Sequence, residues 1–303
     1  MNVLSLFDGI SGAQVALRNL GVTPSLYCAS EINRKSIQIP RNNFPFTVQL
    51  GTVEGLDASG FISYSRYDLV VFGTPCTDLS VAKKNRQSLQ GKSSSLFYEA
   101  IKVLKVVKPR YFLMENVASM SEASKNEISE LLGVEPVRIN SNHFIPQNRD
   151  RLYWFNWKMP ELPAPTPKRF EELLFDEQMV NDDASYFKYN ISSKGLAYMT
   201  RTVKGGRDHF SFKHHSDTEN KNSACIVSNF KKGVPYNVLI DRRVTKLHRL
   251  YLPWYRHFDP VECERLQGFP DDYTKGVANT HRFEAIGNAF TVPVIENILR
   301  PII

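Results

Sequence analysis

The sequence predicts an α/β protein in which a parallel sheet carries the chemistry and a second, smaller region follows. Short apolar runs, such as residues 69–72, alternate with helical stretches, and their β-branched and aromatic residues are typical of strands buried on both faces. Four prolines, at 160, 163, 165 and 167, mark a boundary between the two regions. At 303 residues, 42% of them hydrophobic, the chain is long enough to bury a full core.

The first strand is expected over residues 3–7 and the first helix over residues 13–20, with a glycine turn between them. A strand, a glycine turn and a helix are typical of a nucleotide site. Only Gly9 and Gly12 are present, so the three-glycine dinucleotide pattern is absent and a nucleoside cofactor without phosphates is favoured. A second strand, residues 26–30, ends at Glu31, where a carboxylate can accept hydrogen bonds from both ribose hydroxyls.

The next strand, residues 69–72, is stopped by Gly73 and Pro75 and followed by Cys76. Cys76 therefore stands just past the carboxyl end of a central strand, where open α/β sheets hold their ligands. The thiol is a candidate nucleophile, although a buried, inert cysteine is the alternative. Residues 77–95 are polar and are expected to form a loop that could close over a substrate, with Lys83, Lys84 and Arg86 as candidate contacts to it.

A helix over residues 96–107 and a strand over residues 111–114 are expected to bring Glu115 and Asn116 to the same edge as Cys76. A carboxylate that only caps the following helix is the alternative. Farther on, Arg149 and Arg151 alternate into a strand at residues 152–155. They are expected to share one face, an arrangement suited to phosphate or base contacts.

The positive charge is concentrated in one block. Residues 188–256 hold fourteen Lys or Arg against four Asp or Glu, a local excess of +10, whereas the whole chain carries +7. Aromatic residues are interleaved with this charge, which favours nucleic-acid binding over a merely solvated basic face. Histidines and Cys225 in the block match no usual zinc spacing, so no metal is expected. The candidate nucleic-acid contacts here, which would bind DNA in the family named below, are Arg201, Lys204, Arg207, Lys231, Lys232, Arg242 and Arg243.

The four cysteines include no CxxC pair, which fits reduced thiols. No run of eighteen apolar residues occurs, and the first residues lack the features of a signal peptide. We therefore expect a cytoplasmic protein without a membrane partner.

Several motifs, in this order, resemble those of the DNA (cytosine-5) methyltransferase family. The resemblance covers about residues 1–157 and 257–303, with features similar to bacterial or phage enzymes and to the animal de novo branch. Thr52 departs from the family pattern, which usually has an aspartate there, and residues 158–256 match no familiar recognition domain. The motifs are Phe7-Asp8-Gly9 with Gly12, Glu31, Pro75-Cys76, Glu115-Asn116-Val117, Gln147-x-Arg149-x-Arg151, Leu266-Gln267-Gly268-Phe269-Pro270 and Gly287-Asn288-Ala289-Phe290.

The resemblance implies a Rossmann-like, S-adenosylmethionine-dependent methyltransferase sheet over residues 1–157, a target-recognition region over 158–256, and a return to the catalytic domain over 257–303. It also implies that Cys76 adds to C6 of a flipped-out cytosine, that Glu115 holds the base, and that Arg149 and Arg151 hold its oxygen and a flanking phosphate. The cofactor residues it implies are Phe7, Asp8, Gly9, Ile10, Ser11, Gly12, Glu31, Ile32, Val53, Pro75, Leu96, Asn288, Ala289 and Phe290.

Double-stranded DNA is the implied partner, and a companion restriction endonuclease is a possible second one. The fold and motifs also leave open an RNA cytosine-5 methyltransferase and a non-catalytic DNA-binding relative. A folate-dependent pyrimidine nucleotide methylase also adds a Pro-Cys thiol to C6, but it needs neither the glycine turn with Glu31 nor the basic block. The target sequence and the oligomeric state stay open.

Overall fold

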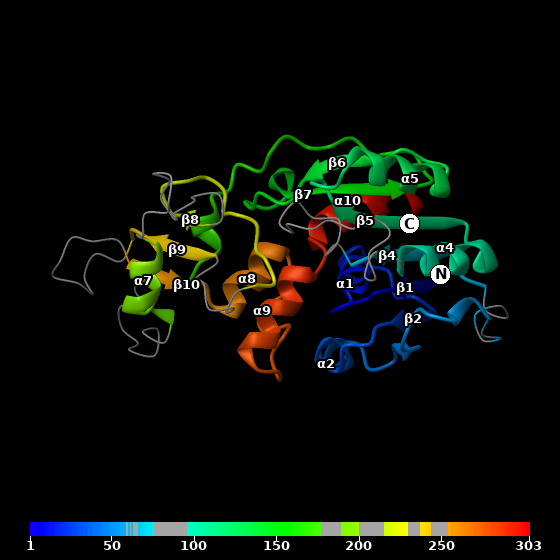
Figure 1. Cartoon of the computed structure of the whole chain (residues 1–303), viewed down its shortest axis with the longest axis horizontal. Helices are drawn as coiled ribbons and strands as arrows, with labels where there is room; N and C mark the ends of the chain where they lie inside the picture. The colour runs from blue at the N-terminus through cyan, green and yellow to red at the C-terminus, as the bar shows by residue number, and fades with distance from the viewer. Residues whose placement is uncertain are drawn as a thin grey trace. The chain divides into compact units, whose positions relative to one another are not determined.

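The structure, a computed structural model, groups the chain into two compact units, each described by itself (Figure 1). Unit 1 comprises Met1–Asn140, Asp150–Glu161 and Phe290–Ile303, and unit 2 comprises Ser141–Arg149 and Leu162–Ala289. The change of unit after Glu161 lies in the proline-rich segment. The sequence analysis placed the return of the chain to the catalytic domain at residue 257. In the structure, the residues that group with the sheet again begin at Phe290. The structure describes residues 1–58, 60, 62, 66–75, 96–176, 189–199, 215–229, 237–243 and 254–303.

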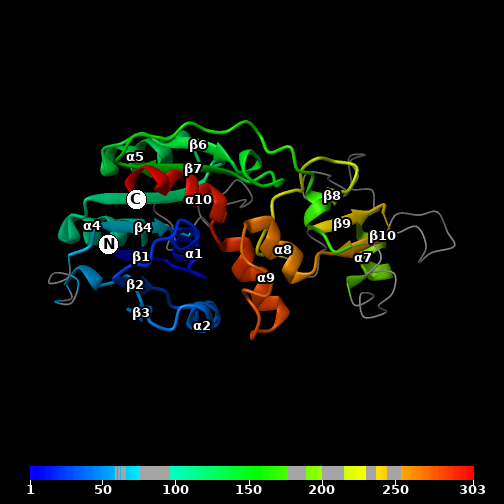
Figure 2. The ribbon, with the colours of Figure 1, turned by 180° about the vertical axis from the view of Figure 1, so that it is seen from behind.

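Unit 1 is built on a seven-stranded sheet with the order β3-β2-β1-β4-β5-β7-β6. The first five strands of that order are parallel, whereas β7 runs antiparallel to both β5 and β6. Figure 2 shows β3 beside β2 at one edge. The strands are β1 (Asn2–Leu6), β2 (Leu26–Ser30), β3 (Val48–Gln49), β4 (Leu69–Gly73), β5 (Tyr111–Val117), β6 (Val137–Asn140) and β7 (Asp150–Phe155).

The helices of unit 1 follow the strands, and α4 has the expected bounds. Ser121 caps the start of α5 by accepting from the Ser124 N–H, and Gly133, with φ of 71°, ends it in the left-handed conformation that glycine adopts without strain. No helix in the described ranges is long and apolar enough to cross a membrane. The helices are α1 (Gly12–Asn19), α2 (Arg34–Asn43), η1 (Leu56–Ala58), α4 (Leu96–Val107), α5 (Glu122–Leu132), α10 (Val292–Leu299) and η7 (Arg300–Ile302).

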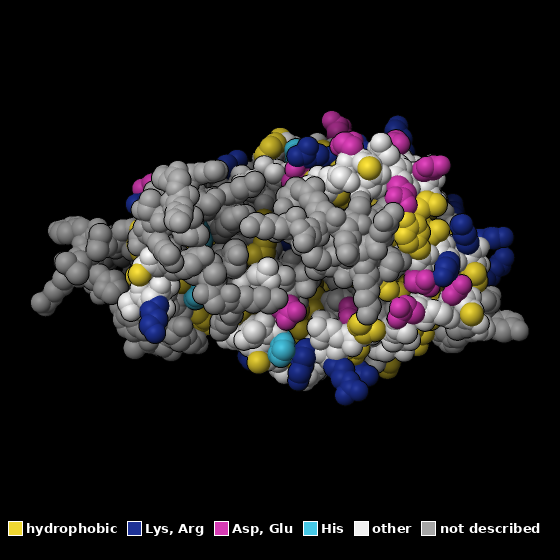
Figure 3. Space-filling view, viewed as in Figure 1, with side chains coloured by type: hydrophobic (Ala, Val, Ile, Leu, Met, Phe, Trp, Pro, Cys, Tyr) yellow, Lys and Arg dark blue, Asp and Glu magenta, His cyan; other side chains and the backbone are white. Residues whose placement is uncertain are grey.

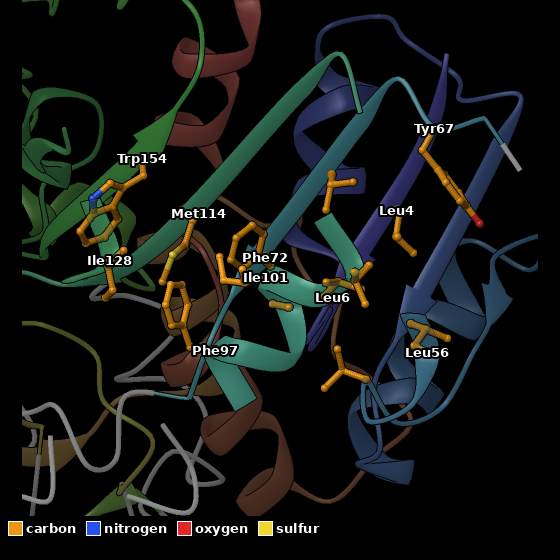
Figure 4. Packing of buried hydrophobic residues seen from close by; sticks show 14 of the residues in the cluster. Leu4, Leu6, Leu56, Tyr67, Phe72, Phe97, Ile101, Met114, Ile128 and Trp154 are labelled. Carbon is orange, nitrogen blue, oxygen red and sulfur yellow. The ribbon is translucent and has the colours of Figure 1, made fainter. Parts of the chain in front are cut away.

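The core of unit 1 forms where the central strands meet α4 and α5. Leu69 to Phe72 are fully buried, as their unbroken apolar run predicts. Phe72, Met114 and Trp154 come from three strands and pack with Phe97 of α4 in one cluster (Figure 4). Complete burial of such a side chain contributes about 1.5–3 kcal/mol. This packing holds the ends of β4 and β5 in a rigid frame.

The bounds of β5 correct the expected position of Glu115 and Asn116. β5 continues to Val117, so Glu115 and Asn116 lie within the strand rather than after it. Glu115 pairs with Gly73 of β4 on one side and with Tyr153 of β7 on the other. The ladder therefore fixes the backbone of Glu115 from both sides, a constraint that a loop residue would lack.

Unit 2 contains a three-stranded sheet with the order β10-β9-β8, and the helices α8 and α9 follow that sheet in the chain. Asp259 and Glu262 form a capping box that starts α8, and Gly268, with φ of 79°, ends it. The elements are η3 (Ser141–His143), η4 (Phe170–Leu173), α7 (Ser193–Met199), β8 (Ser216–Asp217), β9 (Val238–Asp241), β10 (Trp254–His257), α8 (Pro260–Gln267) and α9 (Asn279–Asn288).

Candidate active site

A tight turn follows β1. Phe7, Gly9 and Ser11 all have left-handed backbone angles, with φ of 55°, 60° and 57°. This conformation costs a non-glycine residue about 1–2 kcal/mol, so Phe7 and Ser11 hold strain that the surrounding fold supports. The turn also orients the Gly9 N–H, which donates to Glu31 Oε2 at 3.0 Å. The two segments expected to form a nucleoside site are therefore joined directly.

The carboxylate of Glu31 organises the end of β2. Its Oε1 accepts from the N–H groups of Ile32 at 2.8 Å and Asn33 at 2.7 Å, while Oε2 accepts from Gly9. The Ile32 side chain beside it is 72% exposed. A fixed carboxylate next to an accessible apolar side chain suits a ligand that carries a ribose and an aromatic base.

Asp8 is a buried carboxyl group in the same turn. It accepts hydrogen bonds from the hydroxyl of Tyr27, at 2.9 Å, and from that of Ser11. Burial raises its pKa above the ordinary value of 3.8, although these hydroxyl groups oppose the shift. Tyr27, which the sequence analysis did not single out, therefore belongs to the wall of this turn.

The remaining cofactor candidates of unit 1 differ in exposure. Ile10, Ser11 and Val53 are buried, whereas Leu96 is half-buried at the start of α4. Near Val53, the N–H of Glu54 donates to Thr52 Oγ1 at 3.2 Å, and Thr52 Oγ1 lies 3.4 Å from Glu54 Oε2. An exposed carboxylate thus stands two residues after the position where the family usually carries aspartate, a feature that the motif comparison missed.

Glu115 and Arg151 form an ion pair at the end of the central strands. Arg151 Nε lies 2.9 Å from Glu115 Oε1, and the side chains are 15% and 14% exposed. Asn116, next to Glu115, donates from Nδ2 to Thr74 Oγ1 at 3.0 Å. It therefore braces the segment that leads from β4 through Pro75 toward Cys76. Cys76 itself lies outside the described residues.

Phe290 lies against the end of β4. A Cβ atom built on Gly73 would lie 2.9 Å from Cε1 and 3.3 Å from Cζ of the Phe290 ring, and 3.4 Å from Glu115 Oε2. Only a residue without a side chain leaves room for that ring. Phe290 was expected in the cofactor pocket, and the structure places it beside the Glu115 carboxylate.

Arg149 differs from Arg151 in its position and in its partners. β7 begins at Asp150, so Arg149 precedes the strand and belongs to unit 2. Its side chain is buried and donates to the carbonyls of Ile226 at 3.0 Å, Gly287 at 3.1 Å and Ala289 at 2.8 Å. Arg149 therefore holds backbone segments of unit 2 together. Its contact with cytosine or phosphate stays a prediction, as does the cofactor contact of Asn288 and Ala289.

Two of the expected DNA contacts form ion pairs within unit 2. Arg242 binds Asp217 with two hydrogen bonds of 2.8 Å, and Arg243 binds Asp241 with hydrogen bonds of 3.0 and 2.9 Å. These pairs give both arginines a structural role that the charge count could not reveal. The other basic candidates lie outside the described residues, namely Lys83, Lys84, Arg86, Arg201, Lys204, Arg207, Lys231 and Lys232.

Fully buried charges lie next to these pairs. Arg256 of β10 donates to both oxygens of Glu262, at 2.8 and 2.7 Å, and to Asp241 Oδ2 at 3.1 and 3.3 Å. Arg256, Asp241 and Glu262 are 1% exposed or less. The network ties β9 and β10 to α8. Within the ranges that the structure describes, no cluster of His, Cys, Asp and Glu could hold a metal ion.

Comparison with known proteins decides the family. The family model described as C-5 cytosine-specific DNA methylase matches residues 1–303. The chain belongs to this family. As a C-5 cytosine methylase, it is a methyltransferase whose methyl donor is S-adenosylmethionine. The Rossmann-like methyltransferase sheet implied by the motifs is confirmed.

Relatives of this methylase cover between half of the chain and almost its whole length. The type II methyltransferase M.HpaII of Haemophilus parainfluenzae is 26% identical over 97% of this chain and 86% of its own. The orphan methyltransferase M.Rho11sI of Bacillus phage rho11s is 32% identical, over 50% of this chain and 32% of its own. Among solved structures, S. pombe Dnmt2 superimposes with a TM-score of 0.69 at 20% identity, covering 100% of this chain and 99% of that protein.

Proposed function

We propose that this methylase transfers a methyl group to C5 of a flipped-out cytosine in double-stranded DNA through a covalent bond between Cys76 and C6. The ion pair of Glu115 and Arg151 carries the proposal. It stands on strands whose ladder also positions Gly73, three residues before Cys76. A base that reached Glu115 would therefore lie close to the segment that carries the thiol.

Cys76, Glu115 and Arg151 each have a separate role in the proposed reaction. Cytosine C5 is a poor nucleophile, so the Cys76 thiolate adds to C6 and the ring becomes enamine-like, with its electron pair directed to C5. Glu115 would hydrogen-bond N3 and the exocyclic amine, and Arg151, whose Nε fixes that carboxylate, would hold the base oxygen. After methyl transfer, loss of the C5 proton and cleavage of the C6–S bond restore the aromatic ring and the thiolate.

The turns after β1 and β2 fit S-adenosylmethionine. Glu31 would take the ribose hydroxyls, Ile32 and Phe7 would contact the adenine, and Gly9 to Gly12 would lie along the methionine part. When bound, the cofactor supplies an electrophilic methyl group on a sulfonium. The accessible Ile32 beside a fixed carboxylate supports this assignment.

Substitution of the thiol tests the proposal. Cys76→Ala should abolish methyl transfer and leave cofactor binding, measured by calorimetry, nearly unchanged. DNA that carries 5-fluorocytosine should trap a denaturation-resistant adduct with the wild-type enzyme and not with Cys76→Ala, because fluorine cannot leave as a proton does. Turnover by Cys76→Ala would refute the covalent mechanism.

RNA is the alternative substrate. Incubation of the enzyme with labelled S-adenosylmethionine and DNA, RNA or free nucleotide would show which of them receives the methyl group. We place sequence recognition in residues 158–256, where Arg201, Lys204, Arg207, Lys231 and Lys232 remain candidate contacts. We also propose that the enzyme works in a bacterial or phage-infected cytoplasm. Relatives named as type II and as orphan methyltransferases support either a companion restriction endonuclease or action without one.

A further inference from the structure

Helix α2 presents an exposed basic face, and Glu31 is the acidic residue nearest to it in the sequence. Arg34, Lys35 and Arg41 are all exposed, and no Asp or Glu occurs from residue 32 to residue 53. Dark blue side chains over α2 gather at the lower edge of Figure 3. This stretch of unit 1 lies outside residues 77–95 and 158–256, where the candidate DNA contacts were placed above.

The side chains of α2 are divided between its two faces. Ser36, Ile39 and Pro40 are buried against the unit. Arg34, Gln38 and Arg41 follow helical spacing along the opposite face, and Lys35 and Asn42 lie beside them, all exposed. Arginine, lysine and amide side chains are the groups that bind phosphate oxygens in protein–DNA complexes. The exposed face thus consists of phosphate-binding residue types.

Two of these cations stand where a helix disfavours them. Arg34 and Lys35 are the first two residues of α2, and its first turn contains no acidic residue. The positive end of the helix dipole repels cations at that position. Asn33 caps the backbone by accepting from the N–H groups of Lys35 and Ser36, but it brings no negative charge. The nearest acidic residue, Glu31, already accepts from the N–H groups of Ile32 and Asn33. The two cations do not help to stabilise the start of the helix, which leaves them available for a contact outside the fold.

The cations of α2 also lack the partners that other cations of unit 1 have. Lys102, Lys125 and Arg138 pair with nearby carboxylates. Within the described part of the chain, no ion pair involves Arg34, Lys35 or Arg41.

The surface around the end of α2 adds further contact groups. Arg18 of α1 lies over the ring of Phe44, 5.2 Å from its centroid, and brings a fourth exposed cation to this end of the helix. Phe46, two residues farther on, is 93% exposed. Cations with an accessible aromatic side chain are typical of nucleic-acid surfaces.

We propose that the exposed face of α2 binds the phosphate backbone of the DNA substrate independently of sequence. The inference rests on the proposed action on double-stranded DNA. α2 starts four residues after β2 ends, so its basic first turn belongs to the same sheet edge as Glu31. Contact there would add affinity for any DNA and leave the choice of cytosine to other residues.

A charge-matched pair of variants tests the proposal. The first combines Arg34→Gln, Lys35→Gln and Arg41→Gln. The second combines Lys105→Gln, Lys108→Gln and Arg110→Gln, three exposed cations from the last turn of α4 to the residue before β5. They lie where a parallel strand begins, whereas Glu31 and the start of α2 lie where a parallel strand ends. Both remove three positive charges, so a general effect of net charge acts on them alike.

Binding to a DNA duplex is measured against salt concentration. Each lost phosphate contact should lower the slope of log K against log salt by about 0.9, and three contacts by about 2.7. The loss of affinity between 50 and 200 mM salt should then become about 40-fold smaller in the α2 variant, while the control variant keeps the wild-type slope. Calorimetry should give equal S-adenosylmethionine affinities for both.

An unchanged slope in the α2 variant, or an equal change in the control, would overturn the proposal. A slope that changed for an RNA duplex and not for DNA would overturn the DNA assignment. Wild-type enzyme that methylated no DNA would instead refute the proposed function, so the two failures are distinct. If the triple variant did not fold, Arg41→Gln alone should lower the slope by about 0.9.

Discussion

Replacing Gly73 by alanine should disturb the active site through a single steric contact. Gly73 does not need the left-handed conformation, so alanine suits its backbone. The added Cβ would lie 2.9 Å from Cε1 of Phe290 and 3.4 Å from Glu115 Oε2. The variant therefore tests whether the Phe290 ring and the Glu115 carboxylate are positioned by the space above this glycine.

The cost follows from the distances. Carbon atoms pack best at about 3.5–4.0 Å, so the contact with Cε1 is too short by roughly 0.6 Å or more. Overpacking of this kind costs about 1–3 kcal/mol. The ring or the strand must yield, and either movement shifts Glu115, whose backbone pairs with that of Gly73. Gly73→Ala should therefore lose stability and also lower kcat.

Urea denaturation and steady-state methylation of DNA measure the two effects. Phe290→Leu removes the ring edge that the added methyl group would meet, so the double variant should be more stable than the sum of the single effects allows, by about 0.5–3 kcal/mol. The kcat of the double variant should also exceed that of Gly73→Ala.

Strict additivity would refute the reasoning. If the two free-energy changes simply added and Phe290→Leu restored no activity, the ring would not be what excludes a side chain at position 73. A loss of stability with unchanged kcat in Gly73→Ala would show that the contact is structural and does not position Glu115.

Three further predictions concern charges. Arg256→Met leaves Asp241 and Glu262 without their buried counter-charge and should cost about 3–5 kcal/mol in urea denaturation, whereas Arg242→Met breaks a partly exposed pair and should cost about 0–1 kcal/mol. Burial raises the pKa of Asp8, so the native state keeps a proton that the unfolded state loses above pH 3.8. The stability of the wild-type protein should therefore fall as the pH rises through that raised pKa. Over the same pH range, the urea midpoint of Asp8→Asn should fall less than that of the wild type. Glu31→Ala should weaken S-adenosylmethionine binding by about 1.5–3 kcal/mol, roughly ten- to a hundredfold, by calorimetry; wild-type affinity would remove Glu31 from the site.

The sequence by itself determined the elements that local patterns encode. The apolar run at residues 69–72 and the helical period at residues 96–107 predicted β4 and α4, because burial on both faces and a 3.6-residue repeat leave distinct signatures. The order of short motifs indicated the family, which the match over the whole chain confirmed. These signals depend on residues that are close in sequence.

Only the tertiary structure decided which side chains meet. Arg149 and Arg151 look equivalent in sequence, yet one binds carbonyls of unit 2 and the other pairs with Glu115. The contact of Phe290 with Gly73 joins segments far apart in the chain. Such partners are set by strand register and by where a strand begins, since a shift of one residue turns a side chain to the other face of the sheet. No local pattern carries that information.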